Sequence, residues 1–244
     1  MSLYEKIAAR AERNEILFYL GKATQLSLLK VKGALSFGRG RIISDYLKNH
    51  SVRKLQLGSG LKLIDGWLNS DCSLFFKSKC FIDVTAPFPL ADKTFDYVFT
   101  EHVIEHLTYE EGQAMLKESY RVLKPGGGIR VSCPDLRVYI ALFTPEKTPA
   151  QQQFIKMSVD NLPSDIHIYK ESFVINNSLR NWGHKFVYDE ETLTLALESA
   201  GFVGVKRWTP GESDDPNLQG LEDRGPKHEG KCFESQILQA RRPN

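Results

Sequence analysis

Four side chains that could take part in proton transfer follow predicted strands or precede a predicted helix. His102 and His106 come after a predicted fourth strand, Asp135 after a fifth, and His184 before a helix that begins near Asp189. Because ligands of open parallel sheets bind outside the carboxyl ends of the strands, we expect these groups near one site. They are candidate catalytic bases for a substrate hydroxyl or amine, and His106 is favoured. Each also has a structural interpretation, as a turn cap or a packed loop residue.

The histidine pair carries a second chemical hypothesis. Residues 102–106 read HVIEH, which matches the H-x-x-E-H zinc signature of inverted metalloproteases. That signature needs both histidines on one helix face, whereas this motif directly follows an apolar strand and the sequence shows no clear third ligand. We therefore predict no metal site. Zinc hydrolysis through His102, Glu105 and His106 stays an alternative that a metal analysis would test.

A glycine pair and an acidic residue predict a nucleoside cofactor. Gly58 and Gly60 follow a short apolar strand, where a missing Cβ lets the backbone approach a ligand, and Asp71 ends the next strand, placed to bind ribose hydroxyls. A dinucleotide site would need a third glycine where Leu63 stands, and a helix N-terminus for the pyrophosphate. Residues 61–66 are too few for a crossover helix. The pattern favours a cofactor without phosphates over NAD or FAD.

The elements around these residues alternate between strand and helix, which indicates a mostly parallel sheet. Thr108 and Glu111 form a capping-box pattern at the start of the best-signalled helix. A second helix is predicted to begin at Asp189. We expect a further helix around residues 151–159 and more helices within residues 2–50. Two closing strands without a helix between them predict an antiparallel hairpin at the edge of the sheet.

With these features in place, the chain resembles the class I S-adenosylmethionine-dependent methyltransferases. The similarity runs from about residue 55 to residue 135, through LGSG (57–60), Asp71, Asp83, PFPLADKTFDYV (87–98), EHVIEHL (101–107) and RVLKPGGGIRVS (121–132). It implies an α/β, Rossmann-like fold with N-terminal helices and a mostly parallel seven-stranded sheet. The implied strand order is 3-2-1-4-5-7-6, with strand 7 antiparallel. The family usually has a third glycine and a helix after the first strand, and this chain has neither.

The resemblance also implies the cofactor contacts. Residues 58–60 would face the methionine part of S-adenosyl-L-methionine, Asp71 the ribose, and Asp83 with Val84 the adenine, while residues 100–102 flank the cofactor. The product would be S-adenosyl-L-homocysteine. The full set of implied cofactor-binding residues is Leu57, Gly58, Ser59, Gly60, Asp71, Cys72, Asp83, Val84, Thr100, Glu101 and His102.

The function implied by the resemblance is methyl transfer to an oxygen or nitrogen of a small-molecule or glycan-type acceptor. The stretches GW (66–67), PDL (134–136), GHKFVYDEETL (183–193) and GESDDPNLQGLE (211–222) resemble a bacterial subgroup associated with surface-polysaccharide synthesis. A nucleic-acid substrate is not expected, since TEHV follows strand four instead of an N/D-P-P-Y type motif, and aromatic and basic residues do not interleave. A non-catalytic methyltransferase-like scaffold is the alternative.

We divide the chain into a basic helical extension (1–50), a cofactor-binding core (51–141), a substrate-side insertion (142–182) and a C-terminal helix with edge hairpin of the same domain (183–244). Residues 142–182 and 209–231 are expected to form pocket walls. Residues 1–54 carry eleven Lys or Arg against four Asp or Glu, a net +7 within a total of +2. Such an arm suits an anionic membrane surface, a cover over the pocket or a homodimer contact, and the sequence leaves the three open.

Composition places the chain among soluble globular proteins, with 41% hydrophobic and 25% charged residues. Its four cysteines show no C-x-x-C spacing, which predicts a reduced protein without a zinc ribbon or a disulfide framework. No apolar run approaches the ~20 residues of a membrane span, and the N-terminus lacks the apolar core of a signal peptide. We therefore expect a cytoplasmic protein.

Overall fold

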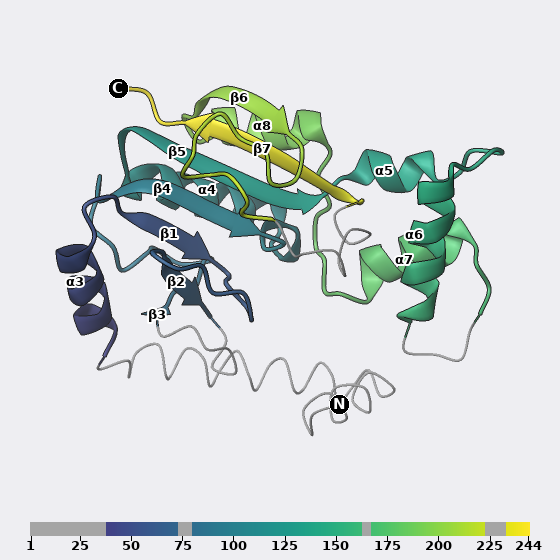
Figure 1. The fold of residues 1–244 in the computed structure, drawn as a ribbon, viewed down its shortest axis with the longest axis horizontal. Helices are drawn as coiled ribbons and strands as arrows, with labels where there is room; N and C mark the ends of the chain where they lie inside the picture. The colour runs from purple at the N-terminus through teal and green to yellow at the C-terminus, as the bar shows by residue number, and fades with distance from the viewer. Residues whose placement is uncertain (1–37, 73–79, 163–166, 223–232) are drawn as a thin grey trace.

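The centre of the structure is a seven-stranded sheet. The computed structural model describes residues 38–72, 80–162, 167–222 and 233–244. The strands are β1 (Lys54–Leu57), β2 (Leu68–Asp71), β3 (Cys80–Phe81), β4 (Phe95–Glu101), β5 (Leu123–Pro134), β6 (Val203–Trp208) and β7 (Ser235–Arg241). They lie in the order β3-β2-β1-β4-β5-β7-β6, and β7 is antiparallel to both of its neighbours (Figure 1). This arrangement confirms the predicted Rossmann-like sheet with an antiparallel edge hairpin.

Strand β1 lies where the strand order reverses. It pairs in parallel with β2 on one side and with β4 on the other, where Leu57 stands opposite Thr100. The chain connects β1 to β2 through residues 58–67 without a helix, as the short spacing predicts. The carboxyl ends of β1, β2 and β4 therefore meet at one edge, which is the place where open α/β sheets bind ligands.

One face of the sheet is covered by two helices with clear N-terminal signals. Helix α4 (Tyr109–Val122) begins with the predicted capping box of Thr108 and Glu111, in which both reciprocal hydrogen bonds form. Helix α8 (Glu190–Ser199) begins with Asp189 as N-cap. Their buried apolar side chains belong to the main core together with those of the strands, and Figure 1 shows both helices behind the sheet.

The opposite face is covered by residues 209–222, which have no regular secondary structure (Figure 1). Their anchor is Arg130 of β5, a side chain with no exposed surface, whose Nη2 donates to Glu222 Oε2 at 2.6 Å. Arg130 Nη1 also donates to the Glu212 carbonyl oxygen at 2.9 Å. The sequence places residues 209–231 at the pocket rim. The described part lies on the sheet face instead, because Glu222 pairs with a strand residue.

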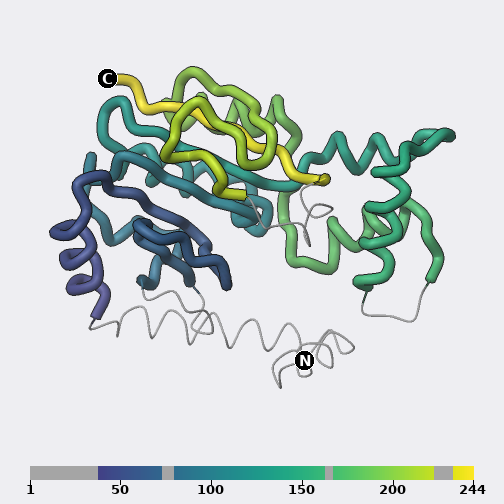
Figure 2. The backbone as a smooth tube through the Cα atoms, viewed as in Figure 1, coloured from purple at the N-terminus to yellow at the C-terminus, as the bar shows by residue number. Residues whose placement is uncertain are grey.

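Three helices form a lobe beyond the carboxyl edge of the strands. They are α5 (Leu136–Ala141), α6 (Pro149–Asp160) and α7 (Glu171–Arg180), and they share an apolar core around Phe154 and Val174. Figure 2 shows the chain entering the lobe from β5 and returning from it toward α8. Helix α6 agrees with the helix predicted near 151–159, whereas the sequence pattern does not predict α7.

Helix α3 (Arg39–Asn49) packs at the other end of the sheet, beside β3 (Figure 1). Its Tyr46 hydroxyl donates to the Lys54 carbonyl oxygen at 2.9 Å, which ties the helix to the start of β1. The remaining N-terminal helices predicted from the sequence lie outside the described residues. Among the helices that are described, none combines the length and the apolar character of a membrane span.

Replacing Glu222 with Gln should destabilise the fold. The change leaves the buried Arg130 guanidinium without a counter-charge, and breaking such a pair costs about 3–5 kcal/mol. We expect the free energy of unfolding in urea to fall by that amount. Asp214→Asn is the matched control, because it removes an exposed ion pair with Lys206 that contributes at most about 1 kcal/mol. Equal losses in the two variants would show that the buried pair does not anchor this segment.

Candidate active site

The loop after β1 folds back onto the end of β2. The Ser59 N–H donates to the Ser70 carbonyl oxygen at 2.9 Å, and the Gly60 N–H donates to Asp71 Oδ2 at 2.9 Å. Asp71 is itself buried, so its carboxylate is held in one orientation at the edge of the sheet. Asp71, which the resemblance implies as the ribose-binding acid, therefore also holds the glycine loop in place.

The two glycines of this loop are needed for different reasons. Both have positive φ, 65° at Gly58 and 52° at Gly60, a region that residues with a Cβ rarely adopt. A Cβ on Gly58 would lie 2.2 Å from Val103 Cγ2, so the glycine permits close contact between the ends of β1 and β4. A Cβ on Gly60 would meet no atom of the described residues within 4 Å, so among these residues that side of the loop is open to a ligand.

Two buried hydroxyls at this edge lack a hydrogen-bond partner among the described residues. They are Ser59 Oγ and Thr100 Oγ1, on residues that are 4% and 1% exposed. Buried polar atoms are normally satisfied, so an unsatisfied pair at a strand end indicates a polar ligand. Together with the open side of Gly60, these hydroxyls make the edge fit the nucleoside cofactor expected from the sequence.

The other predicted cofactor-binding residues lie at the same strand ends. Leu57 is buried in the main core and Val84 packs against it. Cys72 is exposed directly after β2, and Asp83 follows β3 closely. Glu101 ends β4, and its carboxylate forms an ion pair at 3.4 Å with the lysine of the β1–β2 loop.

The residues after β4 form an irregular turn instead of a helix. His102 has a positive φ of 53°, and only Ile104–His106 form a single 3₁₀ turn. His102 Nδ1 lies 3.0 Å from Glu105 Oε1, and its Nε2 lies 3.0 Å from Ser235 Oγ. Both ring nitrogens thus have protein partners. The helical H-x-x-E-H site is not formed here, which corrects the zinc-hydrolase alternative through His102, Glu105 and His106.

The charge state of His102 follows from its neighbours. Burial lowers the pKa of His102, but the hydrogen bond and charge of Glu105, with the charges of Glu234 and Glu101, outweigh burial and raise the pKa above its ordinary value. The protonated form, which donates from both nitrogens, is therefore more favoured than in an unperturbed histidine. That form suits a carboxylate partner on one side and a hydroxyl on the other.

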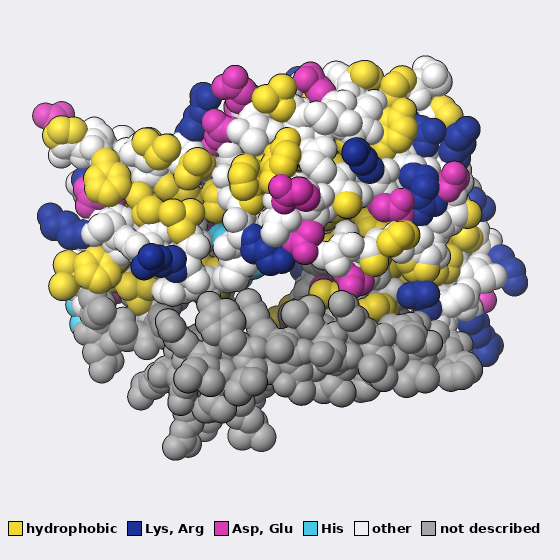
Figure 3. All heavy atoms as spheres, turned by 180° about the vertical axis from the view of Figure 1, so that it is seen from behind, with side chains coloured by type: hydrophobic (Ala, Val, Ile, Leu, Met, Phe, Trp, Pro, Cys, Tyr) yellow, Lys and Arg dark blue, Asp and Glu magenta, His cyan; other side chains and the backbone are white. Residues whose placement is uncertain are grey.

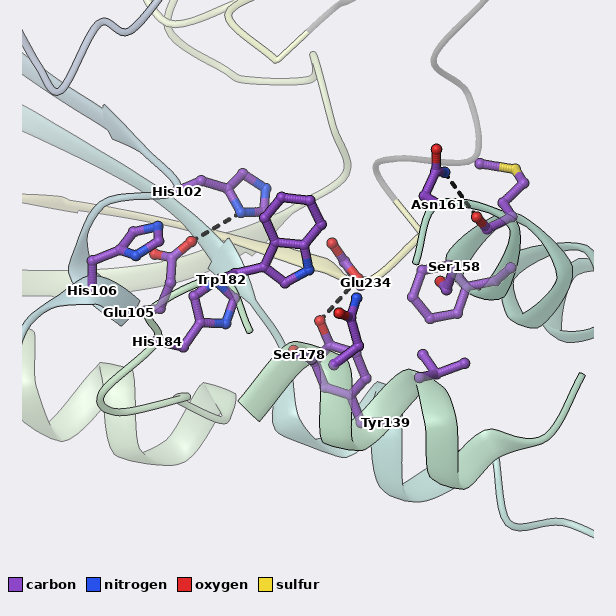
Figure 4. Close-up of a pocket in the computed structure, with 14 residues that line it drawn as sticks. His102, Glu105, His106, Tyr139, Ser158, Asn161, Ser178, Trp182, His184 and Glu234 are labelled. Atoms are coloured by element: carbon purple, nitrogen blue, oxygen red, sulfur yellow. Dashed lines mark hydrogen bonds and ion pairs between the residues drawn. The ribbon is translucent and has the colours of Figure 1, made fainter. Parts of the chain in front are cut away.

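A cavity of about 430 Å³ opens between this turn and the helical lobe. Figure 4 shows histidines and Glu105 entering it from the sheet edge, Trp182 lying across it, and Tyr139 and Ser178 on the lobe side. In the view from behind, a histidine is visible at the junction between sheet and lobe (Figure 3). The lobe thus forms the wall that the sequence expects from residues 142–182.

The cavity brings together three of the four predicted catalytic residues. The rings of His106 and His184 meet edge to face with centroids 4.9 Å apart, and His102 lines the same cavity. Burial lowers the pKa of His184 to about 4, so its ring is neutral at pH 7. Asp135 is not among the lining residues: its carboxylate accepts the Arg137 N–H at the start of α5 and pairs with Arg207 at 2.9 Å.

Several polar groups of the cavity have no clear signal in the sequence. Tyr139 donates to Glu234 Oε2 at 2.8 Å, and Asn177 and Ser178 line the cavity from α7. Asn177 and Ser178 could have been predicted as cavity residues only if α7 had been recognised as a helix from the sequence. Glu105 stands within a recognised motif, but its position as a fully buried partner of His102 depends on the turn that the chain makes after β4.

Sequence comparison gives one family match. Residues 77–131 match the model of a family described as a methyltransferase domain. This segment includes β4, α4 and most of β5. No curated protein matches the chain. The family match and the strand order support the predicted enzyme class, an S-adenosylmethionine-dependent methyltransferase, and with it the predicted cofactor.

The chain is also similar to solved methyltransferase structures. A SAM dependent methyltransferase from Archaeoglobus fulgidus is 18% identical with a TM-score of 0.48, over 92% of this chain and 99% of that chain. A possible histamine N-methyltransferase from Thermotoga maritima is 16% identical with a TM-score of 0.46, over 95% and 98%. The CurJ carbon methyltransferase is 14% identical with a TM-score of 0.45, over 80% and 49%, so this chain spans about half of that one.

Gly58→Ala should destabilise the protein through contact with Val103. The new Cβ would lie 2.2 Å from Val103 Cγ2, and overpacking of this kind costs typically about 1–3 kcal/mol. Val103→Ala in the same chain removes the colliding atom, so a double-mutant cycle in urea should show recovery of more than half of the loss. Gly60→Ala, where no atom of the described residues lies within 4 Å of the added Cβ, controls for the cost of positive φ alone. Additive losses would contradict the close approach.

Proposed function

We propose that the protein transfers a methyl group from S-adenosylmethionine to an oxygen or nitrogen of a small-molecule or glycan-type acceptor. One observation carries the proposal. His102 directly follows the end of β4, which borders the predicted cofactor edge, and it also lines the 430 Å³ cavity. A cofactor at the strand ends and an acceptor in the cavity would therefore be neighbours, as direct methyl transfer requires.

The strand ends would hold the cofactor through groups already described. Asp71 would accept hydrogen bonds from the ribose hydroxyls. The methionine part of the cofactor would lie on the open side of Gly60, and Asp83 with Val84 would contact the adenine. The buried hydroxyls of Ser59 and Thr100 offer further hydrogen bonds. When bound, S-adenosylmethionine supplies an electrophilic methyl group on a sulfonium, which leaves as the neutral thioether S-adenosylhomocysteine.

The cavity would hold the acceptor. Its volume lies within the ~300–1,000 Å³ typical of small-molecule sites, and it combines aromatic rings with amide and hydroxyl groups. Both ring nitrogens of His102 have protein partners, whereas His106 and His184 do not have both nitrogens occupied by partners among the described residues. We therefore assign to this pair the role of accepting the proton that the acceptor loses, with His106 preferred. Positioning would supply most of the rate, since an in-line displacement depends chiefly on the alignment of the reacting atoms.

We place the enzyme in the cytoplasm, where it would serve surface-polysaccharide synthesis, and assign the basic residues 1–54 to an anionic membrane surface, a homodimer contact or a cover over the pocket. Sedimentation with and without anionic vesicles separates the first two of these roles. A chain that stays monomeric and does not sediment with vesicles would refute these two.

Calorimetric titration with S-adenosylhomocysteine tests the cofactor site. Asp71→Asn should weaken binding about 10- to 100-fold, because hydrogen bonds to a charged group are worth about 1.5–3 kcal/mol. Asp65→Asn, the same change on an exposed residue of the β1–β2 loop, should bind like the wild type. NADH should not bind. Equal affinities of the two variants would remove Asp71 from the site, and no binding to the wild type would favour the non-catalytic scaffold.

A further inference from the structure

We propose that Glu105, His106 and His184 bind a divalent metal ion of the zinc class in the wall of the cavity. One donor atom from each of these three residues lies within 4.8 Å of the other two. Two come from the turn after β4 and the third from the segment that precedes α8, nearly eighty residues later in the chain. An ion about 2 Å from each donor would hold the donors about 3.3 Å apart, so binding would draw the more distant of them together. This set differs from the H-x-x-E-H set of the sequence, because His184 replaces His102.

Two of the three ligands present unsatisfied buried atoms. Glu105 has no exposed surface, and its Oε2 has no hydrogen-bond partner among the described residues. His184 is half-buried, and its Nδ1 is a buried atom without a partner at hydrogen-bond geometry among the described residues, although the Ser178 backbone lies near the ring. A buried carboxylate oxygen without a partner is costly, and the cost disappears when a cation binds it. Figure 4 shows Glu105 between the rings of His102, His106 and His184.

The surroundings hold the ligands in place before any ion binds. His102 Nδ1 lies 3.0 Å from Glu105 Oε1, which leaves Oε2 free to face the two other ligands. The Glu105 carbonyl oxygen accepts the N–H groups of Lys185 and Phe186, at 2.7 and 3.2 Å. These two bonds fasten the segment that carries His184 to the turn that carries His106. Such outer contacts orient the ligands of known metal sites.

The donor set selects the class of ion. Two imidazole nitrogens and one carboxylate oxygen match the three protein ligands of catalytic zinc sites, in which a further position stays open to water or substrate. Imidazole prefers zinc and other late transition metals, whereas magnesium and calcium prefer oxygen ligands. We therefore expect zinc to bind far more tightly than magnesium.

The open position gives the ion a role in methyl transfer, and this part of the inference rests on the proposed function. All three ligands line the cavity assigned to the acceptor. The ion would bind an oxygen of the acceptor and hold it next to the cofactor edge. In that arrangement His106 and His184 would act as metal ligands instead of proton acceptors. A bound cation lowers the pKa of a coordinated oxygen, so an acceptor hydroxyl would lose its proton to solvent water before it takes the methyl group from the sulfonium. This favours acceptors with a hydroxyl or a neighbouring pair of oxygens.

Zinc binding to the full chain tests the site. After treatment with a chelator, the wild-type protein should bind one Zn²⁺ per chain by calorimetry and prefer it to Mg²⁺. Glu105→Gln and His184→Gln should each weaken zinc binding by more than the ~10–100-fold caused by loss of an outer partner. His102→Phe, which removes such a partner, should fall within that range. His167→Gln, the same change at an exposed histidine of the lobe, should have no effect.

S-adenosylhomocysteine affinity is measured on Glu105→Gln, His184→Gln and His167→Gln and shows whether their fold is intact. Because His102 is a predicted cofactor contact, the fold of His102→Phe is checked by unfolding in urea instead. A wild type that binds S-adenosylhomocysteine but no zinc would refute the metal site and leave the proposed function standing. Zinc binding without S-adenosylhomocysteine binding would refute the proposed function and leave the metal site standing. Equal zinc affinity in the wild type, Glu105→Gln and His184→Gln would place the ion elsewhere and overturn the assignment of these ligands.

Discussion

The ends of β1 and β4 approach so closely that the Val103 side chain leaves no room for a Cβ on Gly58. This contact sets the path of both chain segments. The chain after β1 must turn with positive φ, and the chain after β4 leaves through a turn that begins with His102, also at positive φ. That turn carries Glu105 into the interior and His106 to the cavity. The proposed cofactor edge and the proposed acceptor cavity therefore depend on one small region of packing.

Buried charges determine how the irregular segments fold. Arg130 draws Glu222, and with it residues 209–222, onto a face of the sheet that would otherwise expose a charged strand residue. His102 holds the buried Glu105 in the same manner on a smaller scale. In both pairs the partner is a side chain from an irregular segment. Segments without regular secondary structure thus take one conformation because a buried charge requires a particular partner.

The sequence predicts those parts of the fold that arise from local patterns. The capping box of Thr108 and Glu111, the N-cap at Asp189 and the short connection after Gly60 can be read from neighbouring residues, and they specify most of the sheet and its helices. The pairing of Arg130 with Glu222 joins residues 92 positions apart and has no local signal.

The candidate site also has one part that local sequence patterns predict and one part that they do not. Its proposed cofactor edge consists of strand ends, whose relative position follows from the order of the elements, so the sequence could predict that these residues lie together. The meeting of His106 with His184 depends on how the lobe returns to the sheet, and the sequence alone could only name both as separate candidates. Asp135 was a reasonable candidate by its place after β5, but Arg207 comes from β6, and only the folded chain brings the two together.

The lobe has its own apolar core, and the chain passes into it after β5 and out of it before α8 (Figure 2). Residues 136–182 are therefore a cassette, a segment that could be exchanged as a unit between related enzymes. Such an exchange would replace Tyr139, Asn177 and Trp182 while the glycine loop and Asp71 stay in place. Specificity for the acceptor could in this way diverge or be engineered at a fixed cofactor site, provided that the new lobe still supplies a partner for Glu234.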